Sequence, residues 1–435
     1  MKENKHYNIY DVLLFLMMAL MIGGNAGGFF QLTRVLHLCL LPFAAYGLLT
    51  KSRDVLKRNL YPTIFLPLWI IYAAVGLIWA EHDIENYKWF IHLCIFSASL
   101  IEVLWLADKA KNPRIAILYG WVTMLVLTVP IAFGEFITDE HLSCCDNKPR
   151  QTTYYGINQA ILRRFASITF DNINAYNMVL CYGLMPIMLF IYSAKKKWQE
   201  ISGYTIWCVI GWIILLNASR AAIACLLASI LLFIILADTR KQRILGGIGV
   251  LLFSAWFALD IAGFSVFPKV VIVGNGSNAP SSAIVGRISN QGVEDVERSQ
   301  IYKMAWQITT EHKFMGCGTG NITHEMFALN KRYAAPHCLW LEVLMQFGII
   351  IFLGFVGLYL SIFVRGIKTT LKTHKRFAIQ ATLLGLMLVA GASISDGTML
   401  LKAPLWMMIA SLYVLTDETY EKHTHEKHTH KHNHK

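Results

Sequence analysis

The sequence predicts an all-α membrane protein that crosses the bilayer about 12 times, and three observations lead to this fold class. Hydrophobic residues make up 55% of the 435 positions, and charged residues only 15%. About a dozen apolar runs fill most of the length, and a helix needs roughly 20 apolar residues to span a bilayer. Lysine and arginine gather in alternate short loops, as expected for a chain threaded back and forth through a membrane.

The predicted spans follow one another with short connections in the first half of the chain. They are residues 9–23, 29–49, 61–80, 88–106, 115–136, 174–193, 203–217, 219–237, 244–260, 338–364, 377–394 and 400–416. The first is short, and Lys2 and Lys5 precede it, so a cleaved signal peptide is an alternative. A second apolar run follows at once, which favours a retained span. The first five spans are otherwise plain, apart from Arg34 and Glu102.

The charges of the loops predict the orientation of the chain. The cationic short loops lie near residues 51–58, 109–114, 195–197, 240–243 and 365–376, whereas Gly23–Gly28, Glu81–Tyr87 and Ser395–Met399 hold no Lys or Arg. Cationic short loops stay on the cytoplasmic side of a membrane. Both termini are therefore expected there, and the long loops at 137–173 and 261–336 in the periplasm. The net charge of +12 then reflects topology against an anionic leaflet, and no nucleic-acid partner is expected.

The longer outer loop divides into two halves. The first, through Asn290, is rich in Gly, Ser, Asn and Pro and is predicted to be irregular. In the second, apolar residues recur from Val293 to Ile308 at spacings of three and four, which predicts a helix on the membrane surface or over a cavity. The run GCGTG at Gly316–Gly320 ends this helix. It has no following lysine and no preceding strand, so it predicts a tight turn rather than a nucleotide loop.

We expect residues 1–416 to form a single transmembrane domain. The segment 417–435 is rich in histidine, and its composition predicts a disordered cytoplasmic tail, with loose metal binding as the alternative.

Three side chains at predicted outer helix ends suit phosphate binding or acid–base catalysis. Arg220 follows Asn217 after a very short turn, so it can offer a planar fork to a phosphate, a snorkelling arginine being the alternative. His337 opens the span at 338–364, and histidine suits acid–base work near neutral pH. Arg298 leads the predicted loop helix, so it can be held in position.

The outer loops contain no DxD pair and no evident cluster of carboxylates with histidine. Since such oxygen-rich clusters are what divalent cations require, no metal or other cofactor is expected.

Five segments follow one another in an order that is typical of one family. They are RRFASITFDNIN from Arg163, NASRAAIACLLAS from Asn217, ERSQIYKMAW from Glu297, FMGCGTGN from Phe314 and APHCLWLEVLMQFGIIIFLGF from Ala335. Together they resemble the O-antigen ligase/polymerase family of bacterial inner-membrane glycosyltransferases, over about residues 160–360. The sequence departs from the family at Cys338, where the family usually has Asn, and at Gln346, where a charged residue is commoner.

The resemblance implies a C-type glycosyltransferase fold and a metal-independent reaction at the periplasmic face. The donor would be O-antigen on undecaprenyl pyrophosphate, and the acceptor a hydroxyl of lipid A–core, in lipopolysaccharide biosynthesis. Arg220 and Arg298 would neutralise the departing pyrophosphate, and His337 would orient or deprotonate the acceptor hydroxyl. Attack opposite the pyrophosphate would invert the anomeric centre.

Four further residues are expected to bind substrate, namely Arg287, Arg164, Asn172 and Arg34. Arg287 is also the alternative to Arg298 as the loop arginine of the site. Arg34 lies about one turn from the outer end of its span, so it can instead snorkel to the surface.

Three other functions remain open at this point. A polymerase of the same family would differ only in its acceptor. A transporter would place ionisable residues near mid-membrane and break its helices there, whereas here the polar residues gather at the outer rim. A membrane scaffold without activity would not need Arg220 and His337 on one face.

Overall fold

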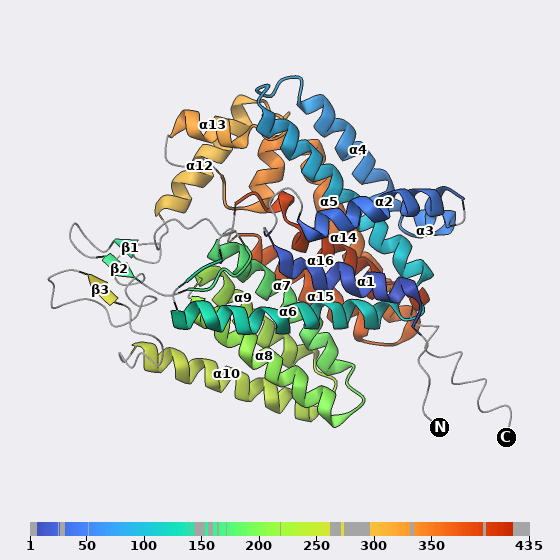
Figure 1. The fold of residues 1–435 in the computed structure, drawn as a ribbon, viewed down its shortest axis with the longest axis vertical. Helices are drawn as coiled ribbons and strands as arrows, with labels where there is room; N and C mark the ends of the chain where they lie inside the picture. Colours follow the sequence, from blue (N-terminus) through green and yellow to red (C-terminus); the bar gives the residue numbers. More distant parts are fainter. Residues whose placement is uncertain are drawn as a thin grey trace.

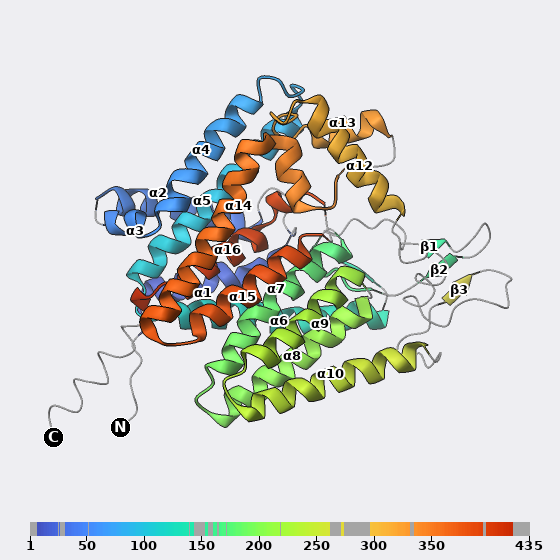
Figure 2. The same ribbon diagram turned by 180° about the vertical axis from the view of Figure 1, so that it is seen from behind.

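The computed structural model describes residues 7–24, 26, 31–50, 52–138, 140–142, 153–154, 160–162, 165–170, 172–217, 219–261, 271–273, 296–330, 335–394 and 397–420. Helices make up nearly all of this described chain (Figure 1 and Figure 2). The first half contains α1 (Ile9–Ala19), η1 (Leu20–Gly23), α2 (Leu32–Thr50), α3 (Arg53–Arg58), α4 (Leu60–Gly76), α5 (Ile84–Lys109), α6 (Pro113–Thr138), α7 (Ile173–Tyr192) and α8 (Lys197–Asn217). The second half contains α9 (Arg220–Leu236), α10 (Arg240–Ile261), α12 (Val296–Glu311), α13 (Ile322–Leu329), α14 (Leu339–Thr373), α15 (Phe377–Ala392), η3 (Met399–Leu401) and α16 (Ala403–Leu415).

The apolar helices of the described chain are those of a multi-pass membrane protein. Six of them, α2, α5, α6, α7, α8 and α14, are long and apolar enough to cross a bilayer, and five shorter apolar helices accompany them. Every predicted span coincides with a helix, although α10 begins with three cationic residues and is not among these eleven. The number of 12 crossings therefore stays a prediction.

The centre of the bundle is formed by α7 and α16. All but 6% of the most apolar stretch of α7 is buried, because α6, α8, α9 and α15 surround it. A helix that is apolar on every side can be covered in this way by neighbouring helices instead of by lipid. Three tryptophans mark the core: Trp69 lies 5.8 Å from Trp406 between ring centroids, and Trp121 donates a 3.0 Å hydrogen bond to the Ser411 hydroxyl.

A buried polar pair lies within this bundle between α2 and α5. The Nδ1 atom of His37 is 2.8 Å from a carboxylate oxygen of Glu102, and both side chains are nearly inaccessible. The pairing explains how Glu102, an exception in an otherwise plain span, can be accommodated, because a hydrogen-bonded partner offsets part of the cost of burying a polar group.

The predicted helix of the long outer loop is confirmed as α12. Its buried face is Ile301, Ala305 and Ile308, which pack with Met326 of α13 and with α14. The helix therefore packs on the first turns of α14, and Figure 1 shows α12 and α13 next to each other at the end of the molecule away from the chain termini.

The glycine-rich turn after α12 docks into a break in α14. The break is at Gly348, where φ is +71° instead of helical. Cys317 N–H donates to the Met345 carbonyl at 2.7 Å, and Ile349 N–H donates to the Phe314 carbonyl at 2.9 Å. The predicted tight turn is confirmed, since Gly316, Gly318 and Gly320 all have positive φ. Its backbone groups form hydrogen bonds with the N–H and C=O groups of α14 that the break leaves without helical partners.

The same turn rests on the hairpin of α4 and α5. Thr319 donates to the Ala73 carbonyl at 2.7 Å, and Trp79 donates to the Gly316 carbonyl at 3.2 Å. Glu81 N–H also donates to the Asn321 side chain at 3.3 Å, which joins the loops 81–87 and 261–336, both predicted to lie on the outer side.

Both described chain ends lie at the opposite end of the molecule (Figure 1). Asp11 near the N-terminus accepts the N–H of Asn112 at 2.7 Å, and Arg114 donates to the Asp417 carbonyl at 2.8 Å. These contacts join loops predicted to be cytoplasmic. They also correct the start of the predicted disordered tail: Asp417 is 3% exposed, and residues 417–420 pack against the bundle because their polar groups bind arginines. Residues 421–435, with all six tail histidines, lie outside the described residues.

Three short strands, which the sequence analysis did not predict, pair the two outer loops. They are β1 (Thr153–Tyr154), β2 (Ala160–Leu162) and β3 (Val271–Val273), and they form an antiparallel sheet in the order β1-β2-β3. The pairing of β2 with β3 joins segments more than 100 residues apart along the chain.

Candidate functional site

His337 lies immediately before α14, in a backbone conformation unusual for any residue but glycine. Its φ is +49°, and Cys338, the cap of α14, is extended. Histidine tolerates such a left-handed conformation better than most residues, at some cost in strain. The imidazole packs on Gly397, where a Cβ atom would lie 3.5 Å from two ring atoms.

A second predicted catalytic residue contacts the same loop as His337. This loop, residues 393–399, connects α15 to η3 and is called the 393–399 loop below. Arg298 of α12 donates a 2.8 Å hydrogen bond to the Ile394 carbonyl, and Leu339 N–H donates to the Ser393 carbonyl at 3.0 Å. The structure therefore brings Arg298 and His337 to one loop, although they come from different segments.

Glu342, which the sequence analysis overlooked, also holds this loop. Its carboxylate is 1% exposed and accepts the N–H of Met399 at 2.9 Å. It lies one turn into α14, five positions after His337, and a carboxylate so close to a candidate histidine was the signal available in the sequence.

Arg298 also lines a shallow cavity on the exposed face of α12. The cavity encloses about 610 Å³, and its other lining residues are Ser299, Tyr302, Lys303 and Trp306. Two cations and two aromatic rings on one surface can hold an anionic group beside an apolar face of a ligand.

Arg220, the third predicted catalytic residue, begins α9 at the same end of the bundle. One and a half turns later, Cys225 packs so closely on Gly391 of α15 that a Cβ there would lie 2.5 Å from its sulfur. Gly391 is three residues before Ile394, to which Arg298 binds. The structure thus places Arg220 towards the end of α15 that carries the 393–399 loop, and a cavity shared by Arg220 and His337 stays a prediction.

Two buried polar side chains hold the segment before α7. Asn217 accepts the N–H of Ala166 at 2.9 Å, and Glu135 accepts the N–H of Ser167 at 2.7 Å and of Ile168 at 3.0 Å. Ile168 has φ of +49°, a costly conformation for a β-branched residue, and these bonds to its neighbours and itself stabilise it. Glu135 is another residue that the sequence analysis did not single out.

The predicted substrate-binding residues differ in what the structure says of them. Asn172 caps α7, because its side-chain oxygen accepts the N–H of Asn174 at 2.8 Å and of Ala175 at 2.9 Å. Arg34 lies over the Phe96 ring, 5.7 Å from its centroid, in a cation–π contact, and the snorkelling alternative stays a prediction. Arg164 and Arg287 lie outside the described residues, and the binding roles of all four stay predictions.

Single histidine–carboxylate pairs do occur in the outer segments. His141 lies 3.4 Å from Glu135, and His312 lies 3.1 Å from Glu325. His324 lies 2.9 Å from Glu81. Within the described part of the chain, however, no group of three or more potential metal ligands occurs. Metal independence remains a prediction.

The two departures from the family pattern have different surroundings. Gln346 is buried, and its side-chain oxygen accepts the N–H of Gly320 at 2.8 Å, so here it fastens the glycine-rich turn to α14. Cys338 occupies the cap position beside His337. Cys317 is a buried free thiol, and burial raises its pKa, so it is not a reactive thiolate.

Comparison with known proteins confirms the resemblance found in the sequence. Residues 204–356 match the family model described as O-Antigen ligase, and this stretch contains Arg220, Arg298 and His337. The teichuronic acid biosynthesis protein TuaE of Bacillus subtilis (strain 168) is 24% identical to this chain over 305 residues, which cover 68% of this chain. The matched region spans 58% of that relative.

Proposed function

We propose that this protein is a membrane glycosyltransferase of surface-polysaccharide biosynthesis, of the O-antigen ligase type. It would transfer a glycan from undecaprenyl pyrophosphate to a hydroxyl of lipid A–core at the outer face of the membrane. The observation that carries the proposal is that His337 and Arg298 contact one loop, within the stretch that matches the O-Antigen ligase model.

The proposed chemistry follows from the residue types at this loop. The pyrophosphate departs with growing negative charge, and the guanidinium forks of Arg298 and Arg220 suit that charge. His337 would accept the proton of the acceptor hydroxyl as it attacks the anomeric carbon and displaces the pyrophosphate. The aromatic rings beside Arg298 offer apolar surface for a glycan.

A second candidate differs in the acceptor alone. The relative TuaE is named for teichuronic acid and not for O-antigen, which favours considering a transferase or polymerase of another surface polysaccharide. The donor chemistry and the proposed roles of the three residues are the same in both cases. Comparing lipid A–core with a second lipid-linked glycan as acceptor separates the two.

The decisive experiment is transfer of glycan from a lipid-linked donor by purified protein. We expect His337→Ala to reduce turnover by about 10²–10⁴-fold, the usual contribution of a general base, while donor binding is retained. His324→Ala is the matched control, because His324 is exposed, pairs with Glu81 and lies at the same end of the molecule. Wild-type turnover in His337→Ala would contradict the proposed role.

The proposal also predicts that activity persists in excess EDTA, since arginines take the place of a metal. Loss of turnover with the chelator, restored by Mg²⁺ or Mn²⁺, would show that a cation and not the arginines neutralises the pyrophosphate.

A further inference from the structure

A groove of about 1110 Å³ lies at the opposite end of the bundle from the proposed active site. Its walls are the beginning of α4, the second half of α14 and the residues that follow α16. Ligand pockets for small molecules commonly enclose about 300–1,000 Å³, so the groove has room for a lipid headgroup and part of its chains.

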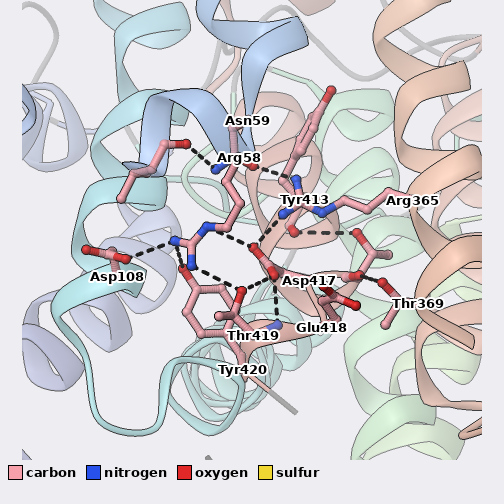
Figure 3. Close-up of polar contacts among 12 residues, drawn as sticks. Arg58, Asn59, Asp108, Arg365, Thr369, Tyr413, Asp417, Glu418, Thr419 and Tyr420 are labelled. Atoms are coloured by element: carbon pink, nitrogen blue, oxygen red, sulfur yellow. Dashed lines mark hydrogen bonds and ion pairs between the residues drawn. The ribbon is translucent and has the colours of Figure 1, made fainter. Parts of the chain in front are cut away.

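One side of the groove carries an excess of positive charge. Four cationic side chains line it, against two acidic ones, and together they are Arg58, Arg365, Lys368, Lys372, Asp417 and Glu418. Figure 3 shows Arg58 and Arg365 reaching Asp417 from opposite sides, which leaves one buried carboxylate between two guanidinium groups. Lys372 lies 2.7 Å from Glu418, whereas Lys368 is exposed and makes no ion pair with any residue that the structure describes.

The charged groups at the base of the groove are firmly held. Arg365 donates to Asn59 at 2.5 Å, and Arg58 lies 2.9 Å from Asp108. Burial acts to lower the pKa of Arg58, but the carboxylates of Asp417 and Asp108 outweigh it, and the pKa is raised above its ordinary value. The base is therefore a preorganised cationic surface, which reduces the cost of ordering side chains on binding.

The other side of the groove is apolar and faces outward. Leu60 of α4 is 58% exposed, and Leu360 and Leu371 of α14 are 57% and 69% exposed. Tyr61 donates to the Gly354 carbonyl at 2.8 Å, and its ring packs against Gly357 of α14. In a membrane protein, outward leucines of this kind are the surface that lipid chains cover.

We propose that this groove binds an anionic phospholipid, with its phosphate against Lys368, Lys372 and the two arginines and its chains along the leucines. Charge complementarity selects an anionic headgroup, and the continuous apolar wall selects a lipid over a soluble phosphate. This binding site is separate from the proposed glycan transfer and does not depend on it.

The test is native mass spectrometry of the full chain, purified without added lipid and then titrated with cardiolipin, phosphatidylglycerol or phosphatidylethanolamine. We expect the anionic lipids to bind and phosphatidylethanolamine to bind far more weakly. The pair Lys368→Gln, Lys372→Gln should weaken anionic lipid binding by about thirtyfold, the effect expected for two lysines near an anionic surface. Val364→Trp, which places an indole in the groove without changing charge, should also reduce binding.

The matched control is the pair Lys195→Gln, Lys196→Gln, which removes two exposed lysines at the same end of the molecule but away from the groove. It should bind lipid as the wild type does, and an unchanged melting temperature in all variants shows that the fold is intact. Equal losses in both lysine pairs would overturn the site, as would equal binding of phosphatidylethanolamine. Displacement of the lipid by millimolar glycerol 3-phosphate or inorganic phosphate would overturn the lipid assignment.

Discussion

The two ends of the molecule use buried carboxylates in different ways. At the end with the termini, Asp417 binds two arginines, Arg58 and Arg365. At the other end, Glu135 and Glu342 accept backbone N–H groups and so hold loops in place. Asp417 therefore fixes charge, whereas Glu135 and Glu342 fix the course of the backbone, as Asp11 also does at the end with the termini.

This difference indicates what each end can do. The two arginines bound to Asp417 are held as a fixed charged surface, whereas loops fixed through backbone bonds can present side chains in set positions. Arg298 and His337 are both presented in this manner around the 393–399 loop. Positioned groups of this kind are what a transfer reaction requires.

The sharpest test of the comparison is whether the two ends lie on opposite sides of a membrane. A cysteine in place of the exposed Lys303 of α12 should react with an impermeant maleimide in cells whose outer layers have been made permeable. A cysteine in place of the exposed Lys195 should react only after the membrane itself is broken. Labelling of both cysteines in unbroken cells, or the reverse pattern, would refute the predicted orientation.

Arg220→Lys tests the catalytic role proposed for the end of the molecule that carries the 393–399 loop. The change keeps the charge but removes the planar fork, so we expect turnover to fall on the order of 10²-fold if the contact strengthens in the transition state. Arg53→Lys, at the other end of the molecule, is the control and should leave turnover unchanged. The measurement is single-turnover transfer at matched protein concentration, and equal rates for Arg220→Lys and wild type would remove Arg220 from the site.

Gly348→Ala should lower the stability of the protein by disturbing the break in α14. A Cβ atom there would lie 2.2 Å from the Phe314 carbonyl oxygen, and φ is +71°. We expect a loss of about 3 kcal/mol in stability, as strain and steric overlap both oppose the native backbone. Gly247→Ala in α10 meets no atom within 4 Å and should be neutral. Thermal unfolding in detergent is the measurement, and equal midpoints for the two variants would contradict the described break.

Asp417→Asn should affect the other end, and by less. It leaves Arg365 and Arg58 without their shared carboxylate, but both are partly exposed, so we expect a loss of about 2 kcal/mol, below that of a fully buried pair. The exposed pair of Asp54 with Lys57 is the control, since Asp54→Asn should change stability very little. Turnover of the folded protein should stay at the wild-type value, and a large fall would mean that the two ends are coupled.

The sequence was most informative about elements with a strong local signal. The helix α12 follows from its three- and four-residue apolar spacing, and the glycine-rich turn from three glycines within five residues. The break at Gly348 could not be predicted, because it depends on a turn from a segment about 30 residues earlier docking against α14. Glu342 was missed for a related reason: its partner, Met399, is 57 positions away.

The amino-acid sequence by itself determined the helices and the resemblance to one family. The apolar character of a run is a local property of the sequence, and the order of motifs can be read along the chain. Only the tertiary structure decided which polar groups meet. It joined Arg298 and His337 at the 393–399 loop, placed Asp417 between two arginines instead of in a solvated tail, and seated the glycine-rich turn in α14. The physical reason is that a buried polar group must find a hydrogen-bonding partner, and packing, not sequence distance, determines which partner is within reach.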